Sequence, residues 1–298
     1  MSDNKAGSKS YDIAVIGCGL MGSALARAFA SKGFSVAAWN RTPERAEALA
    51  GDGITALRSI DDAVRSSRLA VACTSTYDAM LASLDAVTDW WGVTLVNVGS
   101  GSPEGAAKAE HWVNARGANY LDGAVLCYPQ QIGTPDGFIL FSGSPSVWEA
   151  NRPALMALGD ASCHVSDRVG GANVLDAAIV ASFYVSALSA YVEAATYARS
   201  QGVSAEALRM VSISALDTLR QTTEEAAAAI DSGNHDTDQA TLEVYAEGAR
   251  TALASIQAAG HRSRLLEAAV ENLTAAEAAG LGSLGFYAQT KIVSTEGI

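Results

Sequence analysis

The sequence is poor in the residues that build metal centres and disulfide frameworks. Its 298 residues include four cysteines without a CxxC pair and four equally scattered histidines. Because structural zinc sites need clustered ligands, this spacing predicts that the protein holds no metal. Cysteines without paired spacing are typical of a reduced protein, so we expect a cytoplasmic location. The cysteines are Cys18, Cys73, Cys127 and Cys163.

Positive charge is scarce as well. There are 20 lysines and arginines against 32 aspartates and glutamates, a formal net charge of −12. A surface this acidic repels phosphate backbones, so we expect no nucleic-acid partner. Any phosphate site must then be built locally, from backbone amides and a few cations. Lysine is absent from a long part of the chain, since Lys291 is the first one after Lys108.

Long hydrophobic runs are missing too. The longest uncharged helical stretch of interest spans residues 177–192, whereas a membrane-spanning helix needs about 20 apolar residues. We therefore predict no membrane span and interpret this stretch as a buried helix. Residues 1–10 are polar and carry no secretory signal, so they are predicted to form a flexible tail.

The first half of the chain alternates between strand and helix patterns. An apolar strand over residues 11–16 (YDIAVI) is followed by a glycine turn, a helix over 23–32 and a second strand over 35–39 (SVAAW). This alternation predicts an α/β fold, with a Rossmann domain of doubly wound, mostly parallel sheet over residues 11–170. The further predicted helices are 60–66, 81–88, one from Pro103 and 147–158, and the further strands 69–74, 94–98, 119–121 and 138–142.

After about residue 170 the strand patterns disappear and alanine-rich helices dominate. A long interdomain helix is predicted over residues 171–200, followed by an all-α domain over 201–298. Its helical pattern over residues 173–200 reaches about 40 Å, more than a small domain needs. It would therefore link two domains or pack against a second subunit. The helical patterns cover residues 173–200, 204–230, 240–258, 261–279 and 284–293.

The glycine turn after the first strand has the pattern G-x-G-x-x-G, at Gly17, Gly19 and Gly22. Its position between a strand and a helix is the context in which this pattern binds a dinucleotide. Gly17 would allow the tight turn, Gly19 would admit the pyrophosphate, and Gly22 would permit close helix–strand packing. The anion would rest on the helix N-terminus at Leu20 and Met21. A purely structural turn is the alternative.

The end of the second strand distinguishes between the two nicotinamide dinucleotides. Enzymes that use NAD usually carry a carboxylate there, which would repel a 2′-phosphate. This chain has Asn40, Arg41 and Thr42 instead, with Arg45 one turn further on. Guanidinium groups bind phosphate, so the sequence predicts NADPH. The alternative is that both arginines are solvated surface cations.

Two further loops follow strands and are expected to complete the cofactor cleft, because ligands of open α/β sheets bind at the carboxyl ends of strands. Cys73 itself is interpreted as a packing residue, because no histidine or cation is evident beside it. The residues predicted to contact the cofactor here are Cys73, Thr74 and Ser75 in one loop and Asn97, Gly99 and Ser100 in the other.

With these segments in view, the chain resembles the imine reductases and reductive aminases, within the wider β-hydroxyacid dehydrogenase superfamily. The resemblance covers nearly the full length and thins after about residue 200. The segments that carry it are 16–22 (IGCGLMG), 40–42 (NRT), 97–103 (NVGSGSP) and 121–135 (LDGAVLCYPQQIGTP).

The start of the long helix departs from the hydroxyacid dehydrogenases. Their pattern G-x-G-x-x-x-K-x-x-N places a catalytic lysine where residues 170–179 (GGANVLDAAI) place Asp176. A lysine suits a developing alkoxide, whereas a carboxylate suits an iminium cation or, with a raised pKa, donates a proton. The resemblance implies roles for Asp176 and for Tyr184, eight residues later and about 12 Å further along an α-helix. A capping or linker role for Asp176 and plain packing for Tyr184 are the alternatives.

The resemblance therefore implies an NADPH-dependent oxidoreductase that reduces the C=N bond of imines or iminium ions, with or without reductive amination. It implies Asp176, Tyr184 and Asn97 as catalytic residues, and an intertwined homodimer in which one subunit's helical domain closes the other's cofactor cleft. A hydroxyacid dehydrogenase and a non-catalytic NADPH-binding protein are the alternative functions. The residues expected to line the substrate pocket are Val125, Leu126, Tyr128 and Tyr245.

Overall fold

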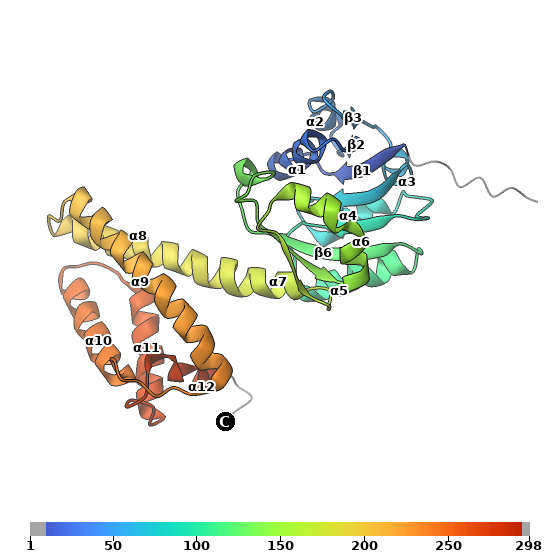
Figure 1. Cartoon of the computed structure of the whole chain (residues 1–298). Coiled ribbons are helices and arrows are strands. Elements are labelled where there is room, and N and C mark those ends of the chain that lie inside the picture. The colour runs from blue at the N-terminus through green and yellow to red at the C-terminus, as the bar shows by residue number, and fades with distance from the viewer. Residues whose placement is uncertain (1–9, 294–298) are drawn as a thin grey trace, which may run out of the picture. The chain divides into compact units, whose positions relative to one another are not determined.

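A computed structural model describes residues 10–293 and divides the chain into two compact units, the first ending at Ser182 and the second beginning at Phe183. The first unit is a sheet with helices on both faces, and the second is entirely helical (Figure 1). The predicted fold class is thereby confirmed. Apart from Ser10, the predicted flexible tail lies outside the described residues.

The first unit contains an eight-stranded sheet with the order β3-β2-β1-β4-β5-β6-β7-β8. Neighbouring strands are parallel except for β6 and β7. Ile16 lies opposite Trp39 and Ala72, and Ala72 lies opposite Asn97, so the carboxyl ends of β1, β2, β4 and β5 meet at one edge. The strands are β1 Tyr11–Ile16, β2 Val36–Trp39, β3 Ile54–Ala56, β4 Ser67–Ala72, β5 Thr94–Asn97, β6 Asn119–Val125, β7 Ile139–Gly143 and β8 Cys163–Ser166.

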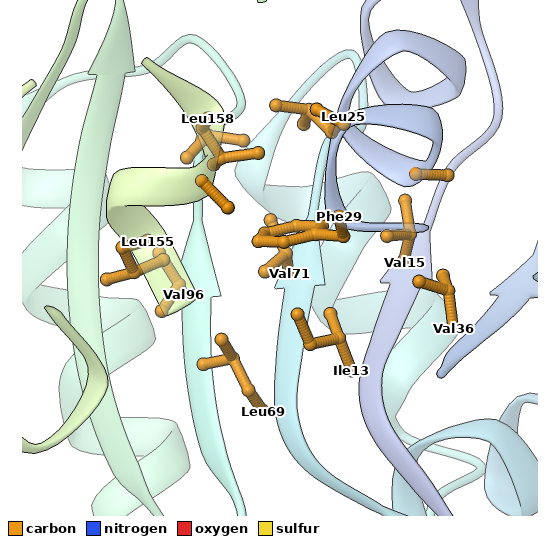
Figure 2. Packing of buried hydrophobic residues seen from close by; sticks show 14 of the residues in the cluster. Ile13, Val15, Leu25, Phe29, Val36, Leu69, Val71, Val96, Leu155 and Leu158 are labelled. Carbon is orange, nitrogen blue, oxygen red and sulfur yellow. The ribbon is translucent and has the colours of Figure 1, made fainter. Parts of the chain in front are cut away.

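Alternating side chains of each central strand enter two separate cores. In β1, Ile13 and Val15 pack with α1 and α6, whereas Ala14 and Ile16 pack with α3, α4 and α5. Figure 2 shows Phe29 of α1 lying over Val71 and the neighbouring strands. Both faces of the sheet are apolar because both are covered. The helices are α1 Leu20–Ser31, α2 Pro43–Glu47, α3 Ile60–Arg65, α4 Tyr77–Leu84, α5 Pro103–Asn114 and α6 Pro145–Leu155.

Three short elements were not predicted, namely α2 and the edge strands β3 and β8. They are only three to five residues long, too short for a hydrophobic period to stand out. The predicted start of α4 at residue 81 was wrong, because the helix begins at Tyr77. There the Thr76 side chain caps it by accepting a hydrogen bond from the amide of Ala79.

A continuous helix, Gly171–Ser200, runs from the first unit into the second. It begins as α7 (Gly171–Leu175), continues as a π-helical segment (Asp176–Tyr184) and ends as α8 (Val185–Ser200). The second unit's small core joins α10, α11 and the C-terminal turns through Leu242, Ala246, Leu273, Ala276 and Ala288. Its other elements are α9 Ala205–Ser232, α10 Leu242–Ala258, α11 Arg264–Ala278, a 3₁₀ turn Phe286–Gln289 and α12 Thr290–Val293.

The expectation that residues 177–192 form a buried helix was wrong for the single chain. No residue of the π-helical segment or of α8 is buried, and Val192 is 64% exposed. The reason is that the sequence pattern shows that the helix is apolar. It does not show whether other residues of the same chain pack against it. By length and hydropathy alone this helix would also reach across a bilayer, a criterion that core and interface helices meet as well.

Candidate active site

The glycine turn has the three geometries that its sequence predicts. Gly17 has φ +100°, and a Cβ there would overlap the carbonyl oxygen of Cys73. A Cβ on Gly22 would overlap the carbonyl of Gly17, so the helix lies directly against the turn. Nothing lies within 4 Å of a Cβ built on Gly19. This last position therefore has the open space that an approaching pyrophosphate requires.

Helix α1 presents an uncapped N-terminus beside this open position. Gly19 is its N-cap residue and provides no side chain, and the first turn contains no carboxylate. The amides of Leu20, Met21 and Gly22 belong to the first turn, where an α-helix leaves its N–H groups without helical partners. Unpaired amides and the helix dipole together favour an anion at this point.

Asn40 connects the glycine turn to the end of β2. Its Oδ1 accepts a hydrogen bond from the amide of Cys18 at 2.9 Å, and its Nδ2 donates to the carbonyl of Thr42 at 2.9 Å. Both ends of the amide are therefore used within the chain. Asn40 holds the loop in shape without adding negative charge, where a carboxylate would repel a 2′-phosphate.

A cavity of about 360 Å³ brings most of the predicted cofactor residues together. Arg41 and Arg45 both line it, and neither forms an ion pair with any residue of the described range 10–293. Two guanidinium groups without a carboxylate partner suit a phosphate dianion. The lining is Gly17, Gly19, Trp39, Asn40, Arg41, Thr42, Arg45, Cys73, Thr74, Ser75, Ala79 and Ser83.

Sequence reasoning missed three of these lining residues. Trp39 ends β2, so its position at the carboxyl edge of the sheet was a usable signal. Ala79 and Ser83 belong to α4 and were missed because its start was predicted too late. Burial raises the pKa of Cys73 to about 11, so its thiol is neutral near pH 7 and forms part of the cavity wall.

The second predicted loop is built around Asn97, which is 1% exposed. Its Oδ1 accepts a hydrogen bond from the amide of Gly99 at 3.1 Å, and its buried Nδ2 has no hydrogen-bond partner among the described residues. Gly99 and the exposed Ser100 do not line the cavity above. A catalytic role for Asn97 stays a prediction, and its burial favours a part in shaping the loop.

A buried polar cluster lies beside this loop and was not predicted from the sequence. Asp122 of β6 has no exposed surface and accepts hydrogen bonds from Tyr77, Tyr120 and Asn173. Burial raises the pKa of Asp122 to about 6, and the hydrogen bonds from these three neighbours oppose that rise. No short sequence signal marks the cluster, because its members are far apart in the chain.

The helix that carries Asp176 is firmly anchored at its start. Gly170 is the N-cap residue with φ +87°, and the amide of Ala172 donates to Oγ of Ser142 at 3.1 Å. Asp176 lies beyond this first turn, so the capping interpretation does not hold. It is partly buried, which raises its pKa, and it has no hydrogen-bond or ion-pair partner within residues 10–293. An unpaired carboxylate of this kind can attract a cation or hold a proton.

Tyr184 belongs to the second unit and is 46% exposed, so it is not a packed core aromatic of that unit. The segment from Asp176 to Tyr184 is π-helical rather than α-helical. The 12 Å expectation assumed an α-helical rise per residue, which does not apply to this segment. π-Helical segments occur frequently at functional sites.

The predicted substrate-pocket residues lie in two places. Val125 ends β6, and Leu126 packs against the cluster that contains Ala172 at the helix start. Tyr128 is 67% exposed. Tyr245 belongs to the second unit, where it contacts Phe286 and lines a separate cavity of about 210 Å³. Their role as one pocket stays a prediction.

Comparison with known proteins covers both units. Residues 12–170 match the NAD binding domain of 6-phosphogluconate dehydrogenase, and residues 169–295 match the C-terminal domain of NADPH-dependent reductive aminase-like proteins. An imine reductase from Myxococcus stipitatus, solved in complex with NADP⁺, is 30% identical with a TM-score of 0.88; the match covers 95% of this chain and 100% of that one. The chain belongs to the imine reductase and reductive aminase family.

Two other members of this family of soluble oxidoreductases are also similar. An imine reductase from Aspergillus terreus, solved with NADPH4 and dibenz[c,e]azepine, is 25% identical with a TM-score of 0.89, and the match covers 96% of this chain and 100% of that one. An NADPH-dependent reductive aminase from Aspergillus oryzae is 30% identical over 177 residues, which span 59% of this chain and 60% of that relative. The resemblance predicted from sequence is confirmed.

Proposed function

We propose that the protein is an NADPH-dependent reductase of C=N bonds, acting on cyclic imines or iminium ions and giving amines. The observation that carries this proposal is Asp176, an unpaired and partly buried carboxylate where hydroxyacid dehydrogenases place a lysine. No lysine occurs between Lys108 and Lys291, so the helix itself carries no ammonium group that could stabilise an alkoxide. This argues against the hydroxyacid dehydrogenase alternative.

The cavity residues fit NADPH. Bound there, the cofactor would supply the hydride. Arg41 and Arg45 would hold the 2′-phosphate, and the amides of Leu20 and Met21 would hold the pyrophosphate against Gly19. The unpaired guanidinium groups support this assignment over NADH.

The other side chains of the site would each have a different role in the reaction. Asp176 attracts the iminium cation in its ionised form, and its raised pKa allows it to hold a proton for the amine nitrogen. The Tyr184 hydroxyl would donate a hydrogen bond to substrate or water. Asn97 would shape the cofactor loop rather than touch the substrate. Val125, Leu126, Tyr128 and Tyr245 would provide apolar and aromatic walls.

The substrate class follows from the same apolar surroundings and from the relatives. Cyclic imines such as pyrrolines or dihydroisoquinolines combine an apolar ring with a protonatable nitrogen. A second candidate reaction is reductive amination, in which the protein also joins a ketone and an amine. The similarity to a reductive aminase and to reductive aminase-like C-terminal domains favours it.

We also propose that two copies pair through the apolar faces of α8 and α9, in the cytoplasm. The exposed apolar residues of these helices, among the described part of the chain, support this assembly, because monomers rarely leave such large apolar surfaces uncovered. They include Leu188, Val192, Met210, Ile213 and Leu216.

The test of this function is the isosteric substitution Asp176→Asn. Turnover of a cyclic imine with NADPH should fall by roughly 10²-fold, the contribution of a positioned acid or base. The matched control is Asp167→Asn, which removes an exposed carboxylate before the same helix and should leave turnover unchanged. If Asp176→Asn turns over at the wild-type rate, Asp176 has no part in the mechanism. A protein that binds NADPH but reduces no imine would support the non-catalytic alternative instead.

A further inference from the structure

We infer that the buried Asp122 is a positioning residue, which connects both cofactor loops to the helix turn that carries Asp176. The inference rests on the proposed function for the meaning of Asp176. It concerns only residues of the first unit. Asp122 itself is fully buried and cannot touch a substrate, so it would act through its hydrogen-bond partners.

Four hydrogen bonds define the connection. The hydroxyl groups of Tyr77 and Tyr120 both donate to Oδ1 of Asp122, at 2.6 and 2.7 Å. The amide Nδ2 of Asn173 lies 2.5 Å from Oδ2 of Asp122 and 2.9 Å from the Tyr77 hydroxyl. Tyr77, Asp122 and Asn173 therefore form a closed triangle, whereas Tyr120 donates to Asp122 from outside it.

The residues of the triangle lie beside the two cofactor loops and the helix turn that carries Asp176. Tyr77 is the first residue of α4 and directly follows the loop whose Cys73, Thr74 and Ser75 line the cofactor cavity. Its ring occupies the space where a Cβ of Gly101 would stand, so the second loop packs against the same side chain. Asn173 precedes Asp176 by one helical turn.

The chemistry of the cluster indicates a role beyond filling space. Asp122 has no cationic partner in the described part of the chain. An uncompensated buried carboxylate is costly, and apolar side chains of similar volume would pack at lower cost. An ionised carboxylate, however, accepts several donors at once from different elements. It can thereby hold α4, β6 and α7 in one arrangement.

The titratable and charged groups around Asp122 are few. Tyr77 from α4 and Tyr120 from β6 face it, while β5 contributes Asn97 and α7 contributes Asn173, both neutral. Burial raises the pKa of Asp122 to about 6, so the carboxylate is mostly ionised at neutral pH.

Two matched substitutions test the inference, Tyr77→Phe and Tyr120→Phe. Each keeps the ring and removes one hydroxyl that donates to the same oxygen of Asp122, but only Tyr77→Phe opens the triangle. Both should lower the melting temperature to a similar extent. Only Tyr77→Phe should lower the turnover of a cyclic imine at saturating NADPH, by about tenfold, the value of one hydrogen bond to a charged group.

Backbone hydrogen exchange of the NADPH-free protein provides a readout that does not depend on activity. Tyr77→Phe should speed exchange in residues 73–76 and 171–176, and Tyr120→Phe should not. Equal effects of the two variants on exchange, or no effect of either, would overturn the inference. If the wild-type protein reduces no imine, the proposed function fails while the exchange comparison still tests the triangle.

Discussion

The two units of this chain differ in how completely they bury their own apolar surface. The first unit covers both faces of its sheet, with Phe29, Leu25 and Leu155 fully buried on one face. In the second, neither α8 nor α9 contains a buried residue within the described range. The first unit thus carries a sufficient core of its own, whereas the second leaves the apolar side chains of α8 and α9 exposed.

The functional groups follow the same division. The cofactor cavity, Asp122 and Asp176 all belong to the first unit, whose loops are shaped by contacts within the chain. Tyr184 and Tyr245 belong to the second unit and are each 46% exposed. Cofactor binding should therefore depend on internal packing, and assembly on exposed helices. Substitutions in the two units should therefore affect these two properties separately.

The largest effect is expected in the core of the first unit. Phe29→Ala removes a fully buried ring between α1 and the sheet (Figure 2) and should lower the free energy of unfolding by ~3–5 kcal/mol. Urea denaturation at several protein concentrations measures it. The loss should not vary with concentration, because the contacts lie within one chain. A loss below about 1 kcal/mol would mean that the face is loosely packed.

The next effect concerns the pH dependence of the first unit's stability. Asp122 has a folded-state pKa of about 6, above its ordinary 3.8. A raised carboxyl pKa stabilises the fold below the ordinary pKa, and this contribution is lost as pH rises through the folded-state value. Relative to Asp122→Asn, the wild type should lose about 2 kcal/mol between pH 4 and pH 7. Parallel pH–stability curves for the two proteins would contradict the assignment.

A charge on the exposed face of α9 should affect assembly instead. Leu216 is 61% exposed in the single chain, so Leu216→Glu should scarcely change the stability of that chain. If the face meets a second copy, the substitution should weaken the dimer by ~2 kcal/mol, the cost of losing an interface hot spot. Analytical ultracentrifugation measures the dissociation constant. Trp91→Glu, at a 74% exposed position of the first unit, is the control that should leave it unchanged.

The smallest effect is expected in cofactor selection, again within the first unit. Arg41→Ala should raise the Michaelis constant for NADPH by about tenfold, the value of one charge-assisted hydrogen bond, and leave that for NADH nearly unchanged. Steady-state kinetics with both cofactors measures the ratio. Equal effects on the two cofactors would identify Arg41 as a surface cation without a role in selecting the 2′-phosphate.

The features that could be predicted from sequence are local ones. The strand–turn–helix order and the separate roles of Gly17, Gly19 and Gly22 follow from hydrophobic period and turn chemistry over a few residues. The same holds for Arg41 and Arg45, which are neighbours in sequence and remain neighbours in the cavity. The α-helical pattern after residue 170 was equally readable from composition.

The features that could not be predicted depend on distant residues or on other chains. The Asp122 cluster joins side chains from positions 77 to 173, which no local pattern relates. The exposure of the stretch 177–192 depends on what covers it, which the sequence of one chain does not state. Asn97 was recognised by its place at the carboxyl end of a strand, but that place did not reveal that its side chain is buried.

The central claim is that the carboxylate of Asp176, rather than a lysine ammonium, acts on the substrate that the reduced nicotinamide reduces. The most direct test follows absorbance at 340 nm while the purified protein meets NADPH and a cyclic imine at neutral pH, beside a parallel mixture of NADP⁺ and a 3-hydroxy acid. NADPH should be consumed in the first mixture, and none should be formed in the second. NADPH formation from the hydroxy acid, without reduction of the imine, would contradict it.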